Sequence, residues 1–154
     1  MKEDNSFEEA KEVLTAYLIK KKHRKTPERY ALLEKIAAYE GHFDAEQLYN
    51  AMVEVYRVSL ATVYNNLELF LDAGLITSHH FAGHTTQFEK TFGSHTHHHL
   101  ICTKCGKVKE FTDKKIKTMI QTKEFAKFQT THYSLYMYGI CSNCSKSKKQ
   151  LDKK

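Results

Sequence analysis

The chain lacks the features that mark several classes of protein. Its 154 residues include only one proline and six glycines, which excludes a collagen-like chain, and 41% of them are hydrophobic, which excludes a chain too polar to fold. No segment approaches the roughly 18 consecutive apolar residues that span a bilayer. The N-terminus, MKEDNSFEEAKE, is acidic and polar and does not resemble a secretory or transit peptide. We therefore expect a cytoplasmic protein with no membrane partner.

The few cysteines form two CxxC pairs, Cys102-Thr-Lys-Cys105 and Cys141-Ser-Asn-Cys144. Disulfides are disfavoured in a reducing cell interior, so the four thiols need another role. A CxxC turn brings two thiolates to one ion at about 2.3 Å, and two such turns complete a tetrahedron. A structural disulfide and a redox-active dithiol are the alternatives. We interpret the four residues as a closed structural zinc site that joins the C-terminal end of the chain to an earlier hairpin.

Histidines are concentrated in one short stretch, with four of the ten in residues 95–99. In a strand, His97 and His99 share one face and His98 points to the other. Glu110 on the next predicted strand can lie near them. Imidazole with carboxylate suits Fe²⁺, Mn²⁺ or Zn²⁺ in an exchangeable site. A solvated histidine cluster is the alternative, and the stretch alone does not identify the remaining ligands.

The positive charge of the chain is unevenly distributed. The net charge is +6, but residues 1–92 carry 11 Lys/Arg against 14 Asp/Glu, a net of −3, whereas residues 93–154 carry 13 against 4, a net of +9. Phosphate contact depends on local density rather than on the total. Six basic residues of the first half crowd one short stretch: Lys20, Lys21, Lys22, Arg24, Lys25 and Arg29. This stretch is either a DNA-backbone contact or a solvated helix end and loop.

The first half of the chain has the pattern of a winged helix. Apolar spacing predicts four helices: 7–22, 27–38, a third after Asp44, and 60–73. Thr26 and Ser59 are expected N-caps of the second and fourth helices, and Asp44 begins a capping box before the third. Alternation then predicts strands over 75–81 and 85–90. The third and fourth helices, joined by Arg57-Val58, form a helix-turn-helix. The first exposed turn of the fourth helix presents residues able to bind bases or phosphates: Ser59, Thr62 and Tyr64, with Asn65 and Asn66 behind them. A helical packing domain without a DNA role is the alternative.

The second half predicts a small α+β unit. Residues 91–94 resemble a hinge, and strands are expected over 98–102, 108–112 and 131–141. A helix is expected over 113–128, with Ile116, Met119, Ile120, Phe125 and Phe128 buried. The predicted fold class is therefore α+β. The expected organisation is a winged-helix DNA-binding domain over 1–90, a hinge over 91–94, a dimerisation and metal-binding domain over 95–145 with the four-cysteine zinc site, and a basic tail over 146–154. Such a small unit gains stability from a metal or a partner chain.

Three segments together resemble the ferric uptake regulator family: SLATVYNNLELFLDAGLI, HHHLICTKCGKVKEF and SLYMYGICSNC. The resemblance runs from about His23 to Cys144, and RKTPERYALL is similar to the family's second helix. It implies a homodimeric metal-dependent repressor that binds double-stranded operator DNA, with no small-molecule substrate. It implies structural Zn²⁺ on the four cysteines and a regulatory metal, Fe²⁺ with Mn²⁺ or Zn²⁺ as alternatives.

The resemblance also implies roles for particular residues. The regulatory metal ligands are His42, Glu89, His97, His99 and Glu110. A thymine contact is implied for Tyr64, and contacts with the DNA backbone or minor groove for the segment of Arg24, Lys25 and Arg29. Together with the helix-turn-helix pattern, the expected DNA-binding residues are Arg24, Lys25, Arg29, Arg57, Ser59, Thr62, Tyr64 and Asn65.

The sequence departs from the family at two places. The family often has a further metal site, but Thr96, Lys117 and Tyr133 stand where its ligands would be, so His98 and His132 are uncertain remnants of a site expected to be absent or weak. The peroxide-sensing branch carries Asp where this chain has Glu89 and Glu110, which argues against metal-catalysed histidine oxidation here. Iron-responsive control of iron uptake is therefore the first interpretation, with zinc-uptake control and peroxide sensing as alternatives.

Two other classes remain as alternatives. A zinc hydrolase or nucleobase deaminase is disfavoured because neither CxxC follows a proline and a four-cysteine site leaves no position for water. A metal store or chaperone would bind metal without metal-dependent DNA binding. We do not expect an enzyme.

Overall fold

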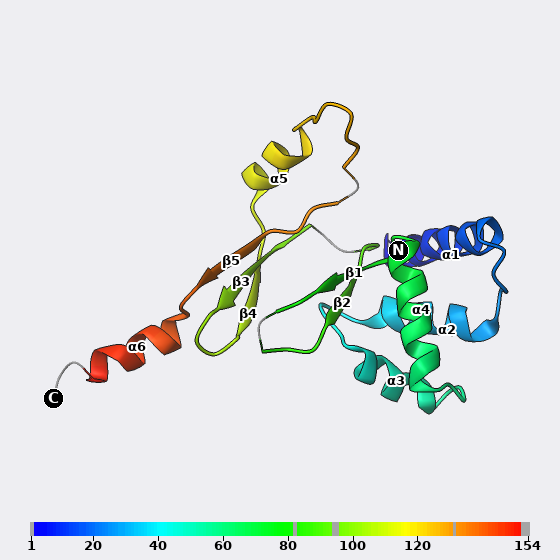
Figure 1. Ribbon diagram of the computed structural model, residues 1–154, viewed down its shortest axis with the longest axis horizontal. Coiled ribbons are helices and arrows are strands. Elements are labelled where there is room, and N and C mark those ends of the chain that lie inside the picture. Colours follow the sequence, from blue (N-terminus) through cyan, green and yellow to red (C-terminus); the bar gives the residue numbers. More distant parts are fainter. Residues whose placement is uncertain (1, 82, 94–95, 131, 152–154) are drawn as a thin grey trace. The chain divides into compact units, whose positions relative to one another are not determined.

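The computed structural model describes residues 2–81, 83–93, 96–130 and 132–151, and it divides into two compact units. The first unit contains residues 1–80 and 84–94, and the second contains residues 81–83 and 95–154. Figure 1 shows the elements of each unit. Ser94 of the predicted hinge, His95 at the predicted start of the second domain, and residues 152–154 of the predicted tail lie outside the described residues. None of the helices searched among the described residues is long and apolar enough to cross a membrane.

The first unit has four helices followed by a hairpin, as the sequence predicted. The helices are α1 (Lys2–Lys20), α2 (Pro27–Ala38), α3 (Ala45–Val53) and α4 (Leu60–Asp72). The strands β1 (Ile76–His79) and β2 (Gln87–Lys90) pair antiparallel and are shorter than predicted. Helix α1 begins five residues earlier than predicted and ends two residues earlier.

Local capping accounts for two of the predicted helix starts. The capping box at Asp44 is confirmed, since its carboxylate accepts from the Gln47 N–H and the Gln47 side chain accepts from the Asp44 N–H. The Ser59 hydroxyl accepts from the Thr62 N–H at the start of α4. Thr26 is the N-cap of α2, as predicted, but its side chain makes no cap bond. Pro27 at the first position supplies a helical φ and has no N–H to satisfy, so α2 starts without that bond.

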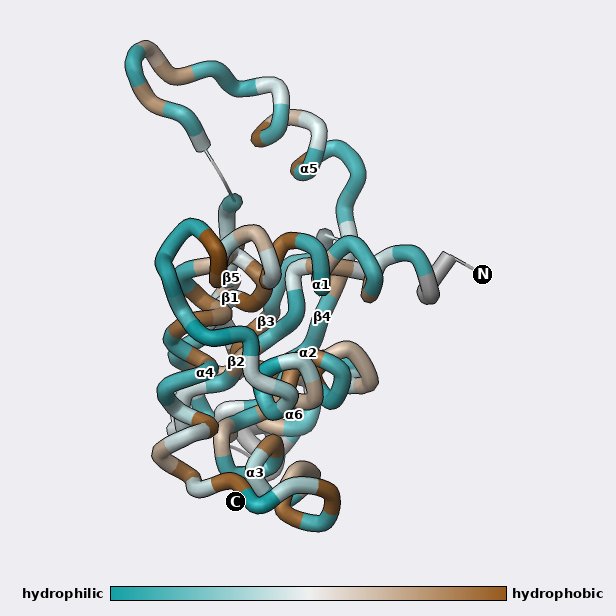
Figure 2. The backbone as a smooth tube through the Cα atoms, turned by 90° about the vertical axis from the view of Figure 1, so that its right-hand side faces the viewer, coloured by the Kyte–Doolittle hydropathy of each residue, from teal (hydrophilic) through white to brown (hydrophobic). Residues whose placement is uncertain are grey.

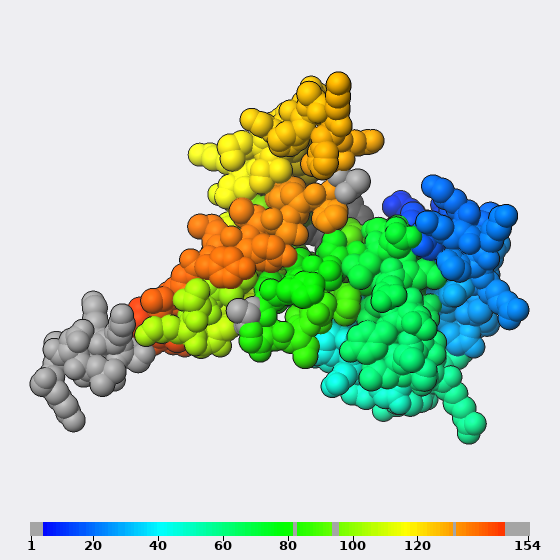
Figure 3. Space-filling view, viewed as in Figure 1, coloured from blue at the N-terminus to red at the C-terminus, as the bar shows by residue number. Residues whose placement is uncertain are grey.

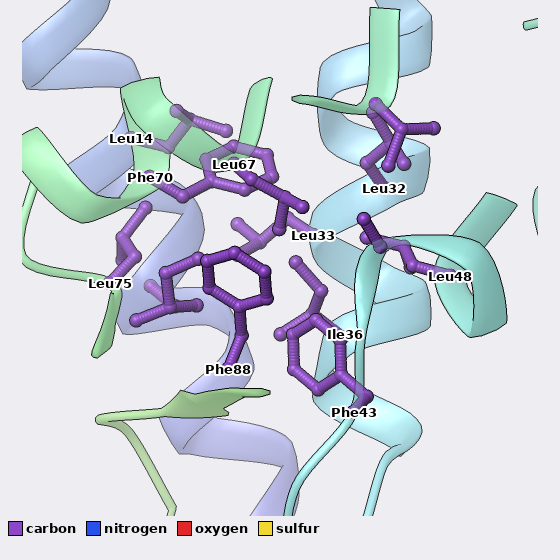
Figure 4. Packing of buried hydrophobic residues seen from close by; sticks show 14 of the residues in the cluster. Leu14, Leu32, Leu33, Ile36, Phe43, Leu48, Leu67, Phe70, Leu75 and Phe88 are labelled. Atoms are coloured by element: carbon purple, nitrogen blue, oxygen red, sulfur yellow. The ribbon is translucent and has the colours of Figure 1, made fainter. Parts of the chain in front are cut away.

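The hydrophobic core lies in the first unit, between the helices and the hairpin. Figure 4 shows Leu14, Leu33, Phe70 and Phe88 converging from α1, α2, α4 and β2. Phe88 is held in register by Phe43, because the two residues exchange backbone hydrogen bonds of 2.9 and 2.7 Å in an antiparallel bridge. The segment before α3 thereby lies along β2 on the side opposite to β1.

The second unit is a three-stranded sheet of order β4-β3-β5, with β3 (His98–Cys102), β4 (Val108–Phe111) and β5 (Tyr136–Gly139). Strands β3 and β4 are antiparallel, and β5 is parallel to β3. Helix α5 (Lys114–Gln121) and the chain after it project from this sheet (Figure 3). Helix α6 (Ser142–Leu151) follows β5 and runs into the predicted tail, where no helix was expected.

Two predictions for the second unit are wrong. The helix expected over 113–128 ends at Gln121, and none of its residues is buried. Met119, Phe125 and Phe128, which were expected to be buried, are 67%, 51% and 69% exposed. The strand expected over 131–141 is limited to Tyr136–Gly139, with Thr131 outside the described residues. Hydrophobic residues alternate with hydrophilic ones along the chain around α5 (Figure 2), and the described part of the chain leaves several of them exposed. The pattern therefore predicted burial that this chain alone does not provide.

Candidate metal centres and nucleic-acid interface

The four cysteines come together at one end of the second unit. Cys102 ends β3, Cys105 lies in the turn after it, and Cys141 and Cys144 lie at the start of α6. The turn is closed by the Gly106 N–H, which donates to the Cys102 carbonyl over 2.9 Å, and Gly106 has a positive φ of 71° that suits glycine. The Cys141 N–H donates to the Cys102 sulfur over 3.3 Å and joins the two CxxC turns. No disulfide links any of the four within the described part of the chain.

The arrangement fits a tetrahedral zinc ion. The four sulfur atoms lie within 4.8 Å of one another, and the Cys105 and Cys141 sulfurs are 3.8 Å apart. Zn–S bonds of about 2.3 Å in a tetrahedron require sulfurs about 3.8 Å apart. Because thiolates occupy all four directions, such an ion has no open position for water or substrate. This geometry defines a structural site rather than a catalytic one.

The thiols differ in acidity because they share hydrogen bonds unequally. Backbone N–H groups of Cys141 and Cys105 donate to the Cys102 sulfur and lower the pKa of Cys102 to about 6. The neighbouring sulfurs of Cys141 and Cys105 accept the Cys144 proton and raise the pKa of Cys144 to about 12. A metal ion must displace the retained proton, so loading of this site releases protons.

Two of the expected regulatory ligands lie together in the first unit. The Phe43–Phe88 bridge places His42 beside Glu89, and the His42 Nε2 lies 3.4 Å from the Glu89 Oε2. Both side chains are largely shielded from solvent, with 14% and 10% of their surface exposed. A buried carboxylate needs a partner, and a histidine pair or a cation supplies one. His42 and Glu89 thus bring one nitrogen and one carboxylate close together, and their role as ligands of a divalent cation stays a prediction.

The other expected regulatory ligands lie together in the second unit. Residues His99 and Glu110 stand directly opposite each other on β3 and β4. The His97 Nε2 is 3.9 Å from the Glu110 Oε1, and the rings of His97 and His99 are 5.0 Å apart. Nitrogen and carboxylate donors of this kind suit Fe²⁺, Mn²⁺ and Zn²⁺. His97 and His99 belong to a group of clustered donors, whereas Glu110 lies beside them outside that group, and the ligand role of all three stays a prediction.

His98 points to the opposite face of β3, as the alternation predicted. It is 1% exposed and packs between Phe111 and Tyr133, with ring centroids 5.2 and 5.9 Å away. Within the part of the chain that the structure describes, neither His98 ring nitrogen has a hydrogen-bond partner. His132 is exposed. Neither residue belongs to a group of clustered donors among the described residues, and their role in a further metal site stays a prediction.

Helix α4 presents the side chains expected to contact DNA. Tyr64 is 49% exposed, and Asn65 and Arg57 are also exposed. The Ser59 and Thr62 hydroxyls lie 2.8 Å apart and form a hydrogen bond with each other, so both side chains make hydrogen bonds at the N-terminus of α4. The mutual bond uses only one of the two O–H groups, so the other can donate to a further contact.

The basic stretch before α2 adjoins the same helix. Arg24 and Lys25 are exposed, and Arg29 is half-buried. The Arg29 guanidinium donates to the Arg24 carbonyl and, over 3.3 Å, to the Asn66 side-chain oxygen. A groove of about 340 Å³ is lined here by Thr26, Glu28, Arg29, Arg57, Val58, Thr62, Asn65 and Asn66. The structure therefore brings Arg29, Arg57, Thr62 and Asn65 to one surface feature.

Sequence reasoning named Asn66 but not its main contact, and it missed His79. Asn66 was expected behind the other DNA-contacting residues; it is 7% exposed, and its side chain links Arg29 to α4. His79 was not considered as a site residue, although its Nε2 lies 3.1 Å from the Glu89 Oε2. Strand alternation places Thr77 and His79 on one face of β1, but only the register of β1 with β2 brings His79 to Glu89.

The comparison with protein families gives one match of wide extent. Residues 20–138 match the model described as "Ferric uptake regulator family". Together with the winged-helix unit and the clustered cysteines, this match shows that the chain belongs to the ferric uptake regulator family of metal-responsive transcription regulators.

Named relatives agree with that assignment. The peroxide-responsive repressor PerR of Staphylococcus epidermidis is 32% identical over 123 residues, which cover 79% of this chain and 81% of that protein. The Vibrio cholerae ferric uptake regulator is 39% identical with a TM-score of 0.57, covering 80% of this chain and 96% of that chain. The Pseudomonas aeruginosa ferric uptake regulator, solved with manganese, is 31% identical with a TM-score of 0.61. This match covers 81% of this chain and 96% of that chain.

Proposed function

We propose that the chain is a cytoplasmic, homodimeric repressor that binds operator DNA when Fe²⁺ occupies its regulatory site. The observation that carries the proposal is the division of donors along the chain. His42 and Glu89 precede residues 91–94 and have side-chain atoms 3.4 Å apart. His97, which directly precedes β3, follows that segment, as do His99 and Glu110 on the adjacent strands β3 and β4. In this proposal one ion takes ligands from both sides of that segment, and the four cysteines hold structural Zn²⁺.

The proposed ion acts by restricting the orientation of the DNA-binding unit, 1–90, about a hinge at 91–94. Two recognition helices of a dimer must be about 34–36 Å apart to enter successive turns of the major groove. Without the ion the units sample many orientations, and DNA affinity falls by the fraction that is competent to bind. Because linkage is reciprocal, operator DNA tightens metal binding by the same factor.

The exposed apolar side chains of the second unit support the homodimer. Large exposed side chains gather on its strands and on the chain around α5: Leu100, Met119, Phe125, Phe128, Met137, Tyr138 and Ile140. Large exposed apolar patches mark interaction surfaces. A second copy of the chain supplies a matching surface, as symmetric dimers require.

Metal titration of DNA binding tests the function. Chelator-treated protein that retains one zinc per chain is titrated with Fe²⁺, Mn²⁺ and Zn²⁺ against a duplex selected from a random pool in the presence of Mn²⁺. We expect the wild type to bind DNA only when metal is present. His97→Ala should lose this metal-dependent DNA binding and remain a folded dimer. Unfolding of His97→Ala, or metal-independent binding by the wild type, would contradict the proposal. A response only to Zn²⁺ at cellular free concentrations would favour zinc-uptake control.

Peroxide sensing is the second candidate, because a peroxide-responsive repressor is among the similar proteins. The carboxylates argue against it, since Glu89 and Glu110 are one methylene longer than the aspartates expected in that branch. Fe²⁺-loaded protein is exposed to hydrogen peroxide, and its histidine peptides are examined by mass spectrometry. We expect no gain of one oxygen on His42, His97 or His99. Rapid oxygen insertion with loss of DNA binding would instead favour peroxide sensing.

A further inference from the structure

A further histidine contacts the carboxylate of Glu89. The Nε2 of His79 lies 3.1 Å from the Glu89 Oε2, the same oxygen that is 3.4 Å from the His42 Nε2. His79 is 3% exposed, and its ring stands perpendicular to that of His42 with centroids 5.2 Å apart. Glu89 therefore lies between two imidazoles.

The pairing of β1 with β2 explains this placement. Thr77 is opposite Glu89, and His79 is opposite Gln87, so Thr77, His79 and Glu89 point to one face of the hairpin while Phe88 enters the core. His79 reaches Glu89 across the diagonal, which long side chains can span. The Thr77 hydroxyl oxygen also lies near this His79 nitrogen, at a distance of 3.4 Å.

We propose that His79 is a positioning residue for the regulatory metal. It donates its Nε2–H to the Glu89 Oε2 and fixes the carboxylate in the orientation that binds the ion. The His79 Nε2 is engaged by Glu89, and His79 is outside the group of clustered donors in the described chain, so we infer that it acts through that carboxylate. Hydrogen bonds to ligating carboxylates typically change metal affinity by about 10–100-fold. This inference rests on the proposed function, because it assumes that Glu89 is a ligand.

The length of the side chain at position 89 is part of the inference. A carboxylate on Glu89 reaches both His42 and His79, at 3.4 and 3.1 Å. The carboxylate of an aspartate at position 89 would lie one methylene closer to the backbone and so farther from both histidines. In a Glu89→Asp background the His79 contact is therefore already weakened, and removing His79 has a smaller effect than in the wild type.

Co²⁺ titration tests the role of His79. The zinc-loaded dimer is titrated with Co²⁺, and the visible absorption of the bound ion gives both the affinity and the coordination. We expect His79→Ala to weaken Co²⁺ binding about 10–100-fold. His79→Gln, which keeps an N–H donor, should recover most of the affinity with an unchanged spectrum. The exposed neighbour provides the control, and His80→Ala should bind as the wild type does.

Three results would overturn the positioning role. Wild-type affinity of His79→Ala would show that the hydrogen bond does not matter. Loss of affinity in His79→Gln together with a changed spectrum would identify His79 as a ligand instead. A lowered melting temperature in His79→Gln, with affinity lost in proportion, would show a merely structural residue. If the wild type takes up no Co²⁺ beyond the cysteine site, or His97→Ala leaves uptake unchanged, the proposed function itself fails.

Discussion

The Arg29 Nε donates to the Asn66 side-chain oxygen over 3.3 Å and so joins the first turn of α2 to the middle of α4. Asn66 in turn donates to the Thr62 carbonyl over 2.8 Å. An arginine held in this way has less conformational freedom to lose when it contacts a phosphate. The pair connects the basic segment before α2 with the helix that presents Tyr64.

The first prediction separates the charge of Arg29 from its orientation. Arg29→Ala should weaken binding to all DNA sequences and reduce the salt slope by about 1, because one phosphate contact is lost. Asn66→Ala keeps the charge and should weaken binding about 2- to 10-fold with the slope unchanged, since only the ordering of one side chain is affected. Filter binding between low and high salt measures both.

A double variant completes that test. If Asn66 acts through Arg29, the two substitutions together should cost no more affinity than Arg29→Ala alone. Additive losses would mean that Asn66 contributes separately, for example by stabilising α4. Melting temperatures of the three variants distinguish that outcome.

Tyr64 should determine sequence preference rather than general affinity. It is 49% exposed in the first turns of α4, where a recognition helix contacts base edges. We expect Tyr64→Ala to lower binding to the selected duplex by about 1–3 kcal/mol. Its binding to random-sequence DNA should change little. An equal loss on both DNAs would show that Tyr64 does not contact bases.

The cysteine site should be required for folding and dimerisation of the second unit. Its described residues bury few apolar side chains, so the energy of a bound zinc ion must replace much of a core. We expect Cys141→Ser to lose the zinc and the dimer, as measured by metal analysis and light scattering. The neighbouring Ser142→Ala, at an exposed position, is the matched control. Retention of zinc and dimer by Cys141→Ser would contradict the structural role.

The sequence predicted the local features and missed those that depend on tertiary contacts. The CxxC pairs and the Asp44 capping box are defined by spacing within a few residues, and both are present as expected. Met119 and Phe128 were expected to be buried because their spacing is amphipathic. Hydrophobic spacing does not state which chain covers the apolar face, and here both are exposed.

The missed contact of His79 has a related cause. Its position is set by the register of two strands, which no local pattern specifies. His42 reaches Glu89 through the Phe43–Phe88 bridge, a contact between residues 45 positions apart. Resemblance to the family identified His42 without that geometry, whereas His79 lies outside the segments that carried the resemblance.

The pH dependence of stability should reveal the link between α1 and α4. The Tyr17 hydroxyl donates to the Asp72 carboxylate, and the Lys21 ammonium lies 3.7 Å from it. This hydrogen bond, followed by the lysine charge, lowers the pKa of Asp72 below its ordinary value of 3.8. Because the pKa of Asp72 is lower in the folded state than in the unfolded state, the ionised carboxylate stabilises the fold at any pH above the unfolded-state pKa. That stabilisation is lost as the pH falls through the folded-state pKa.

We therefore expect Asp72→Asn to lower the melting temperature at pH 6 by a small amount, because the contact is exposed to solvent. The difference between wild type and variant should shrink as the pH falls below 3.8. Acid also removes zinc, but it does so in both proteins, so the difference isolates Asp72. Tyr17→Phe should reproduce most of the effect and add little to Asp72→Asn. A difference that stays constant between pH 6 and pH 3 would mean that the ionised carboxylate does not link the two helices.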